Sequence, residues 1–458
     1  MNSIIRFACK AIKTKKNIRM CSNKPLFSLS LEESYAKRPS FYGSLATKDL
    51  ICEKDIESYK KSADLRKLSI DFKEYNKLYM SVKTARKNRN EVGTKVTAMK
   101  RKLNKFESTS TPEFLNSIKE LQKQYKILKD KFIAIFRFVK YSEFRLPNFI
   151  HYTTPSVNKI IYTYSIKPFF ENFKPKCHSV IGIYHSNLVF YDNVPILYYL
   201  KEPLQRIEEA CSNLFMESFE NDNYTEISNP NVFLGLVPER CCIDYKDLNE
   251  IIQLNFDSDD GVCLTGSSSL VAFTSYFFNR EVENFKAISP LKFVTRGKKY
   301  NVNFSDKKSL FNTCQSTSVD AFILCTNDDN AMLKEYDIVF KNLIKTYESI
   351  GLHFICIKYS PPNLHSYESA ATGFLMFSPS CEKYIEVGRI SICEDFISKR
   401  VHSKYYCKIN NNLNFTSAIY VQSIDITKWI GLLIENTQKE DLTYFIPNVI
   451  KSKLDIDK

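Results

Sequence analysis

A regular spacing of apolar residues early in this 458-residue chain limits the folds that it can adopt. Apolar positions advance in alternating steps of three and four along residues 68–103, with a slip of phase near Ala85, and again along residues 118–139. This period of 3.5 residues is typical of helices that pack along a continuous seam. Pro112, a helix-start signal, precedes the second run. The spacing therefore predicts an antiparallel helical hairpin.

The sequence changes character at Leu146-Pro147-Asn148, where proline cannot continue a helix. Short β-rich runs then alternate with single helical segments at residues 203–220, 331–350 and 427–438. Strands joined by hairpins and single helices favour an α+β domain around a largely antiparallel sheet. We find no apolar run of about 20 residues, so no membrane span is expected.

Two segments carry the positive charge of the chain, which has 65 basic and 51 acidic residues and a net charge of +14. Residues 1–31 hold seven basic residues and no acid, interspersed with apolar ones. This composition predicts a mitochondrial presequence, with a disordered basic tail as the alternative. We expect three parts: a presequence and linker in residues 1–35, a coiled-coil arm in residues 55–145, and the α+β domain in residues 146–458.

The second basic segment, residues 83–131, has 14 basic and five acidic residues. Four lysines at three- and four-residue spacing share one face of the second helix. That face is either a solvated coiled-coil surface or a contact surface for nucleic-acid phosphates. The candidates for RNA contact are Lys83, Arg86, Lys87, Arg89, Lys100, Arg101, Lys119, Lys123, Lys126 and Lys129.

Other common signatures are missing from the sequence. The 14 cysteines form no C-x-x-C pair, and the Cys241–Cys242 doublet has no histidine at zinc-ligand spacing. We therefore expect reduced, mostly buried thiols and no metal site. No dinucleotide fingerprint, phosphate-binding P-loop, zinc-protease motif or serine-hydrolase elbow is present.

Several local motifs stand in the order, and near the spacing, that is found in seryl-tRNA synthetases of class II. The matching stretches are Thr84–Asn90 (the basic arm motif), Leu146–Pro155 (the P-N-x-x-H entry to the catalytic domain), Leu204–Pro230 (motif 1), Tyr384–Arg400 and Leu432–Pro447. The chain resembles this family over about residues 60–450. The resemblance implies a tRNA-binding-like arm, a class II domain and a dimer through motif 1.

Motif 1 supplies candidates for a dimer interface, although an apolar helix face also fits plain core packing. They are Leu204, Ile207, Cys211, Leu214, Phe215 and Pro230.

The same comparison implies that the catalytic residues of the family are missing. The motif 2 arginine and glutamate fall on Asn301 and Asn303, and the motif 3 arginine falls on Lys428. From the family's pocket, the resemblance leaves only Glu386, which in the family holds magnesium and ATP, and the Lys399–Arg400 pair. The degenerate positions are Ser267, Ser269, Asn301, Asn303, Cys314, Gly373, Leu375, Glu386, Arg389, Ile392 and Lys428.

Losing one preorganised electrostatic group typically costs about 10²–10³ in rate, so the loss of several predicts a pseudoenzyme with no catalytic residues, cofactor or metal. The chain is similar to the insect mitochondrial seryl-tRNA synthetase-like proteins, which are regarded as inactive. This resemblance implies a matrix protein that pairs as a heterodimer with the active mitochondrial seryl-tRNA synthetase and contacts tRNA or other mitochondrial RNA. The alternatives are a stand-alone RNA-binding protein and, less favoured, a divergent active synthetase with replacement cations at Arg296, Arg389 and Lys428.

Overall fold

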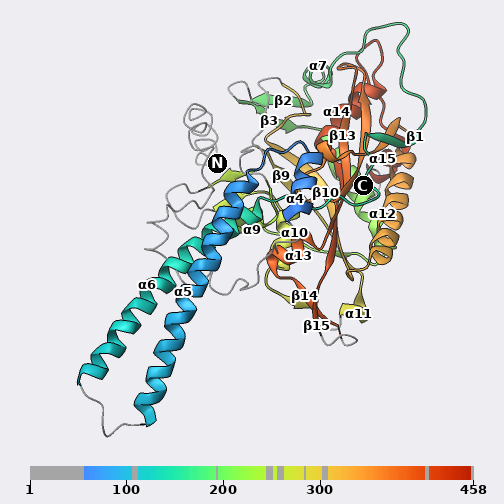
Figure 1. The fold of residues 1–458 in the computed structure, drawn as a ribbon. Coiled ribbons are helices and arrows are strands. Elements are labelled where there is room, and N and C mark those ends of the chain that lie inside the picture. Colours follow the sequence, from blue (N-terminus) through green and yellow to red (C-terminus); the bar gives the residue numbers. More distant parts are fainter. Residues whose placement is uncertain are drawn as a thin grey trace. The chain divides into compact units, whose positions relative to one another are not determined.

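The computed structural model describes residues 56–105, 112–191, 194–243, 251–254, 262–282, 285–301, 308–407 and 412–454 (Figure 1). The predicted presequence, residues 1–35, lies outside the described residues. The chain divides into two compact units between Leu146 and Pro147. In the described ranges no helix is both long and apolar enough to cross a membrane.

The first unit contains α4 (Ile56–Leu65) and two long antiparallel helices, α5 (Phe72–Lys105) and α6 (Pro112–Phe144). The Asp71 carboxylate begins α5 by accepting hydrogen bonds from the backbone N–H groups of Lys73 and Glu74. The seam predicted from the 3.5-residue period is confirmed within α5 and α6, where its positions are buried or half-buried, whereas Leu68 at the start of the predicted run lies before α5 and is 40% exposed. Its buried members are Tyr75, Tyr79, Val82, Ile118, Phe132 and Val139.

The phase slip of the seam has a structural counterpart. Where apolar residues are missing from α5, Arg86 and Arg89 lie over the ring of Phe132, with the Arg89 guanidinium carbon 4.3 Å from the ring centroid. One turn further on, Gly93 leaves room for Tyr125, whose ring would lie 3.0 Å from a Cβ atom at that position. Cation–π contacts and a small residue therefore keep α5 packed against α6 where the apolar pattern is interrupted.

The second unit is built on an eight-stranded sheet in the order β1-β11-β12-β13-β16-β10-β9-β4. All its ladders are antiparallel except the short β4–β9 pair. The expected α+β class with a largely antiparallel sheet is confirmed. The strands are β1 (Lys159–Tyr164), β4 (Thr225–Glu226), β9 (Leu291–Tyr300), β10 (Gln315–Cys325), β11 (Phe354–Lys358), β12 (Ala370–Ser378), β13 (Lys383–Glu394) and β16 (Ser417–Asp425).

Alternate residues of β10 enter two different hydrophobic cores, one on each face of the sheet. The larger core lies under α8 (Leu204–Glu220), α12 (Asp329–Ile350), α14 (Ile426–Thr437) and α15 (Asn448–Leu454). The smaller core includes α9 (Leu236–Arg240), α10 (Leu270–Tyr276) and α13 (Phe396–Val401), with the rings of Phe273 and Phe322 stacked 5.4 Å apart. The only tryptophan of the chain, Trp429 of α14, is fully buried in the larger core.

Short elements surround the main sheet. One two-stranded sheet pairs β2 (Leu188–Tyr191) with β3 (Val194–Leu200), and α7 (His178–Tyr184) directly precedes it. The others are β5 (Val232–Leu234), β6 (Ile252–Gln253), β7 (Val262–Leu264), β8 (Glu281–Val282), α11 (Phe285–Ile288), the 3₁₀ turn Pro361–Asn363, β14 (Lys404–Cys407) and β15 (Asn412–Phe415).

The candidate interface residues of motif 1 fall mostly inside the chain. Leu204, Ile207, Cys211 and Phe215 have no exposed surface, and Leu214 packs against the same core. Pro230 is exposed. The apolar face of α8 therefore packs onto the sheet of its own chain, as the core-packing alternative expects, and those four buried side chains cannot contact a partner.

Candidate functional site

The strand register brings two degenerate positions, Gly373 and Arg389, into one row across the sheet with two further polar residues. Gly373 of β12 lies opposite Arg389 of β13, which lies opposite Gln422 of β16, which lies opposite Asp320 of β10. Directly paired residues of neighbouring strands point to the same face. The row therefore assembles one site from four strands, as a substrate pocket would require.

Arg389 fills the middle of this site. Its Nε and Nη2 atoms each donate a hydrogen bond of 2.7 Å to the carboxylate of Glu368, which has no exposed surface. Glu368 also accepts hydrogen bonds from the Ser391 hydroxyl at 2.5 Å and the His365 backbone N–H at 2.7 Å. Burial acts to raise the pKa of Glu368, but the Arg389 charge and these hydrogen bonds hold it below its ordinary value of 4.5.

Glu386, which the motif resemblance assigns to an ATP site, is bound by the same arginine. Arg389 Nη1 lies 3.1 Å from the Glu386 carboxylate, and the Tyr359 hydroxyl also donates to it. The Arg389 guanidinium lies over the Tyr359 ring, 4.4 Å from its centroid. Burial and the Glu386 charge raise the pKa of Tyr359, so its hydroxyl stays a donor. Glu386 is thus engaged by neighbours from its own chain.

Tyr359 also explains the glycine at position 373. A Cβ atom on Gly373 would lie 2.5 Å from the Tyr359 hydroxyl oxygen. The acidic side chain that the resemblance would place here would collide with Tyr359, because the tyrosine ring occupies that space. Leu375, the second position of the same family motif, lies opposite Glu386 in the β12–β13 ladder.

A third ion pair joins β9 and β10 at the end of the row. Lys299 Nζ lies 2.8 Å from the carboxylate of Asp320, which is fully buried and also accepts from the Ser318 and Tyr420 hydroxyls. The proposed replacement cations are engaged as well. Arg296 donates to Asn213 at 2.7 Å, and Lys428 lies 3.6 Å from Asp425 at the start of α14.

The loop at the family's serine-recognition position lies flat against β9. A Cβ atom on Gly266 would collide with the Lys298 carbonyl, and one on Gly297 would collide with the Ser267 hydroxyl. Ser269 serves as the N-cap of α10 and accepts a 3.2 Å hydrogen bond from the backbone N–H of Ala272. These serines have structural roles in a loop that leaves little space above the strand.

The remaining degenerate positions lie at the edge of this arrangement. The backbone N–H of Asn301 donates to the Cys314 carbonyl at 2.8 Å, and burial raises the pKa of the Cys314 thiol to about 11. Ile392 is buried in the larger core. Lys399 pairs with Asp395 at 2.8 Å, whereas Arg400 is buried. Asn303 lies outside the described residues.

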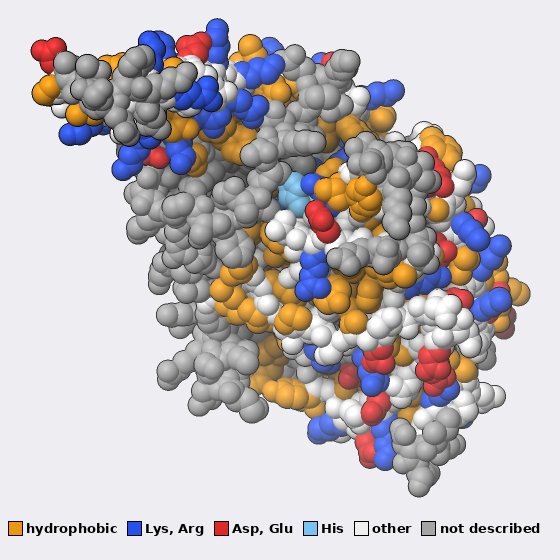
Figure 2. Space-filling view, turned by 90° about the horizontal axis from the view of Figure 1, so that it is seen from below, with side chains coloured by type: hydrophobic (Ala, Val, Ile, Leu, Met, Phe, Trp, Pro, Cys, Tyr) orange, Lys and Arg blue, Asp and Glu red, His pale blue; other side chains and the backbone are white. Residues whose placement is uncertain are grey.

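The arm residues proposed to contact RNA divide into two groups. Arg86 and Arg89 are half-buried against Phe132, so they belong to the seam. The other eight are exposed, and Figure 2 shows Lys and Arg side chains gathered over this helical hairpin. These eight are Lys83, Lys87, Lys100, Arg101, Lys119, Lys123, Lys126 and Lys129.

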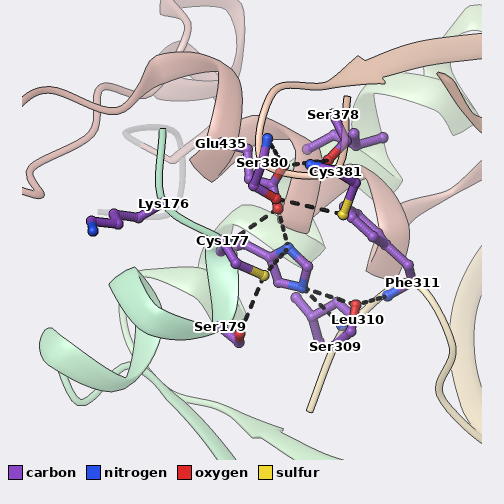
Figure 3. A network of polar contacts seen from close by, with 12 residues as sticks. Lys176, Cys177, Ser179, Ser309, Leu310, Phe311, Ser378, Ser380, Cys381 and Glu435 are labelled. Atoms are coloured by element: carbon purple, nitrogen blue, oxygen red, sulfur yellow. Dashed lines mark hydrogen bonds and ion pairs between the residues drawn. The ribbon is translucent and has the colours of Figure 1, made fainter. Parts of the chain in front are cut away.

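Sequence reasoning missed one buried polar cluster, in which Cys177, His178 and Glu435 place potential metal-ligand atoms within 4.8 Å of one another (Figure 3). His178 Nδ1 lies 2.7 Å from the Glu435 carboxylate, and the backbone N–H of Leu310 donates to His178 Nε2 at 2.9 Å. Because Nε2 accepts a hydrogen bond, the ring proton sits on Nδ1 and donates to Glu435. A metal at Nδ1 would need the opposite tautomer, so the cluster fits a structural role.

This cluster ties together segments that are far apart in the sequence. Glu435 accepts hydrogen bonds from the Ser378 hydroxyl at 2.5 Å and from the backbone N–H of His178 at 3.2 Å. Burial acts to raise the pKa of Glu435, but the hydrogen bonds that it accepts from His178 and Ser378 hold it below 4.5. Since 257 positions separate His178 from Glu435, no local signal in the sequence could have paired them.

Comparison with known proteins agrees with the architecture of the second unit. The family model described as the tRNA synthetase class II core domain (G, H, P, S and T) matches residues 257–437. Two solved structures share the fold. The chain superposes on the seryl-tRNA synthetase of Pyrococcus horikoshii complexed with ATP with a TM-score of 0.74 and 17% identity, covering 89% of this chain and 98% of that one. The cytoplasmic serine-tRNA ligase of Naegleria fowleri in complex with AMP gives a TM-score of 0.71 and 13% identity, covering 88% and 94% of the two chains.

Curated relatives point to the same family at low identity. A serine–tRNA ligase of Saccharolobus islandicus is 23% identical over 263 residues, 57% of this chain and 56% of the relative. The serine–tRNA synthetase-like protein Slimp of Drosophila melanogaster is 25% identical over 292 residues, 62% of this chain and 61% of Slimp. The chain thus spans somewhat more than half the length of the curated relatives that it matches.

Proposed function

We propose that this seryl-tRNA synthetase homologue, whose residues 257–437 match the class II core, is a non-catalytic mitochondrial paralogue that acts by association. In this proposal it is the pseudo-subunit of a heterodimer with the active mitochondrial seryl-tRNA synthetase, and it supports the stability or the tRNA serylation of that enzyme. One observation supports the non-catalytic part: Arg389, Lys299 and Tyr359 engage the carboxylates of the site that the motif resemblance assigns to ATP.

The physical argument concerns the charge that ATP would bring. Activation of an amino acid needs cations, or metal ions held by carboxylates, that face the phosphates. Here Glu368 and Glu386 share Arg389, and Asp320 holds Lys299. Freeing Arg389 for a phosphate would leave the Glu368 carboxylate buried without its partner, which typically costs about 3–5 kcal/mol. Nucleotide binding would therefore have to break a stable internal network.

Two further observations support the rest of the proposal. The basic, acid-free composition of residues 1–31 supports import into mitochondria. Similarity to Slimp, which is itself named a synthetase-like protein, supports a paralogue rather than a second synthetase. Class II subunits pair through self-complementary surfaces, so a paralogue can replace one subunit of a dimer.

The test compares the chain alone, the active synthetase alone and the two co-expressed. We expect the chain alone to give ATP–pyrophosphate exchange at the buffer background, and to form a one-to-one complex whose serylation or solubility exceeds that of the synthetase alone. Serine-dependent exchange by the chain alone would contradict the non-catalytic assignment. A fluorescent fusion with and without residues 1–35 tests the mitochondrial location separately.

A stand-alone RNA-binding role is the second candidate, and the eight exposed basic residues of the arm favour it. Changing Lys119, Lys123, Lys126 and Lys129 together to alanine should weaken RNA binding and flatten its dependence on salt, because each lost phosphate contact lowers the slope by about one unit. The matched control changes three exposed lysines of α12, Lys334, Lys341 and Lys345, to alanine. An unaltered salt slope in the arm variant would exclude the arm as the binding surface.

A further inference from the structure

The segment between β1 and α7, residues 165–177, exposes two large apolar side chains to water. Ile166 is 88% exposed and Phe169 is 83% exposed, the two highest values among the large apolar residues that the structure describes. We call residues 165–177 the strap; in Figure 1 it is the green line that runs along the outside of the second unit from β1 to α7. Two such side chains within four residues are more than the scattered exposure of an ordinary surface, and they indicate a site of interaction.

The strap is held at both ends. At its start, His353 Nδ1 lies 3.2 Å from the carbonyl oxygen of Ser165. At its end, the side-chain amide of Gln438 accepts a hydrogen bond of 2.8 Å from the backbone N–H of Lys176 and donates one of 3.1 Å to the carbonyl oxygen of the same residue. Because Gln438 is buried at the end of α14, these bonds fix the strap to the body of the second unit.

Contacts within the strap use other side chains than the two exposed ones. Phe170 and Phe173 are half-buried and pack edge to face, with their ring centroids 5.2 Å apart. The Lys167 ammonium lies over the ring of Phe377 of β12, 3.8 Å from its centroid. The strap is therefore packed onto the second unit through its inner side, and Ile166 is left exposed on the other side.

Exposed positive charge accompanies the apolar side chains. The strap contains three lysines, Lys167, Lys174 and Lys176, and a single acid, Glu171, so it has an excess of positive charge. All three lysines are exposed. Apolar side chains that enter the acyl region, beside lysines that meet anionic headgroups, are the combination by which a protein binds to the surface of a membrane without crossing it.

This composition fits a lipid surface better than a protein or a nucleic acid. Lysine is depleted at protein–protein interfaces, whereas it is common in segments that bind anionic lipids. A single-stranded nucleic acid is bound by stacking of its bases on aromatic rings, but Ile166 has no ring, and Phe170 and Phe173 already pack against each other. The transfer of an exposed aliphatic side chain into hydrocarbon is favourable by itself.

We propose that the strap binds the surface of an anionic phospholipid bilayer. Ile166 and Phe169 insert between the acyl chains, and the three lysines of the strap contact the phosphate groups of the lipids. Because only one loop enters the bilayer, the attachment needs no membrane-spanning helix and is reversible. The inference goes beyond the proposed function, since it gives the chain a location on a membrane whether or not the chain pairs with a synthetase.

The experiment detects insertion at the strap itself, because the basic residues 1–31 and 83–131 of the full chain also attract anionic vesicles. Phe169→Trp is mixed with vesicles of equal parts phosphatidylcholine and phosphatidylglycerol that carry bromine on their acyl chains, since bromine quenches the fluorescence of a tryptophan only at close contact. The control is Tyr406→Trp, at a side chain that is 49% exposed on the β14–β15 hairpin. Trp429 is buried and contributes the same background to both variants.

A second measurement compares affinities for the same vesicles at high salt, which screens the other basic segments. The double change of Ile166 and Phe169 to serine should weaken binding about ten-fold or more, because two large apolar side chains no longer enter hydrocarbon. At low salt, the change of Lys167, Lys174 and Lys176 to alanine should weaken binding more than the matched change of Lys334, Lys341 and Lys345 on α12.

We expect the brominated vesicles to quench Phe169→Trp and to leave Tyr406→Trp unquenched. Equal quenching of the two variants, or quenching of neither, would overturn the inference. Equal quenching of Phe169→Trp by brominated vesicles of phosphatidylcholine alone would overturn the choice of an anionic surface. A fluorescence change of Phe169→Trp with single-stranded RNA but not with vesicles would overturn the inference in favour of nucleic-acid binding.

Discussion

The ion pair between Glu368 and Arg389 makes the sharpest prediction about stability. Glu368→Gln removes the negative charge from a carboxylate that has no exposed surface and accepts two 2.7 Å hydrogen bonds from the arginine. Removing one partner of a buried pair typically costs about 3–5 kcal/mol. Arg389 keeps Glu386 at 3.1 Å and the Asn363 carbonyl at 2.9 Å, so we expect the lower end, about 3 kcal/mol.

Urea unfolding followed by the fluorescence of Trp429 provides the assay, because this sole tryptophan is buried in the same unit. With a slope near 3 kcal/mol per molar urea, a loss of about 3 kcal/mol lowers the midpoint by about 1 M. The control Glu209→Gln makes the same chemical change on the exposed side of α8 and should stay within about 0.5 kcal/mol. A midpoint for Glu368→Gln equal to that of the control would refute the reasoning.

The pH dependence gives an independent check. Since the pKa of Glu368 is held below 4.5 in the folded chain, its contribution is fully present above pH 4.5 and is lost as the pH falls through the lowered value. The difference between the natural chain and Glu368→Gln should therefore be largest at neutral pH and shrink in acid. The double variant Glu368→Gln with Arg389→Met should recover part of the loss, because no unpaired buried charge remains.

Three other predictions concern the site, the buried cluster and the arm. Gly373→Asp should destabilise the chain by about 1–3 kcal/mol, because its Cβ atom meets Tyr359, and should not create ATP binding in a calorimetric titration; rescue by Tyr359→Ala would verify the collision. Glu435→Gln should cost about 2 kcal/mol in urea unfolding, since His178 loses its charged acceptor, whereas equal stability at pH 7 would argue against the assigned tautomer. Phe132→Ala should cost about 3–5 kcal/mol by removing a buried seam residue under two arginines, measured by circular dichroism of the full chain, with Lys87→Ala as the exposed control; a loss no greater than the control's would contradict the packing of the seam.

Local patterns predicted the helices and strands of this fold, because residues close together in the sequence determine where each element forms. The 3.5-residue period of the arm requires only that one face of each helix be buried, and burial follows that period from Tyr75 to Val139. Motif order likewise predicted the class II architecture, which does not depend on the catalytic residues. The slip near Ala85 was visible in the sequence, but its repair by Arg86 and Arg89 over Phe132 was not, because it involves the opposite helix.

Which side chains pair in the candidate site could not be predicted in this way, because the partners are far apart in the sequence. The motif resemblance by itself predicted that the phosphate-binding arginines are replaced and that Glu386 is kept. Only the tertiary structure decided that Arg389 is shared by Glu368 and Glu386, and that Tyr359 fills the space over Gly373. Likewise, the apolar stripe of α8 fits either a core or an interface until the sheet beneath it is known. Amphipathic periodicity shows that a face is covered, and the identity of what covers it is a property of the folded chain.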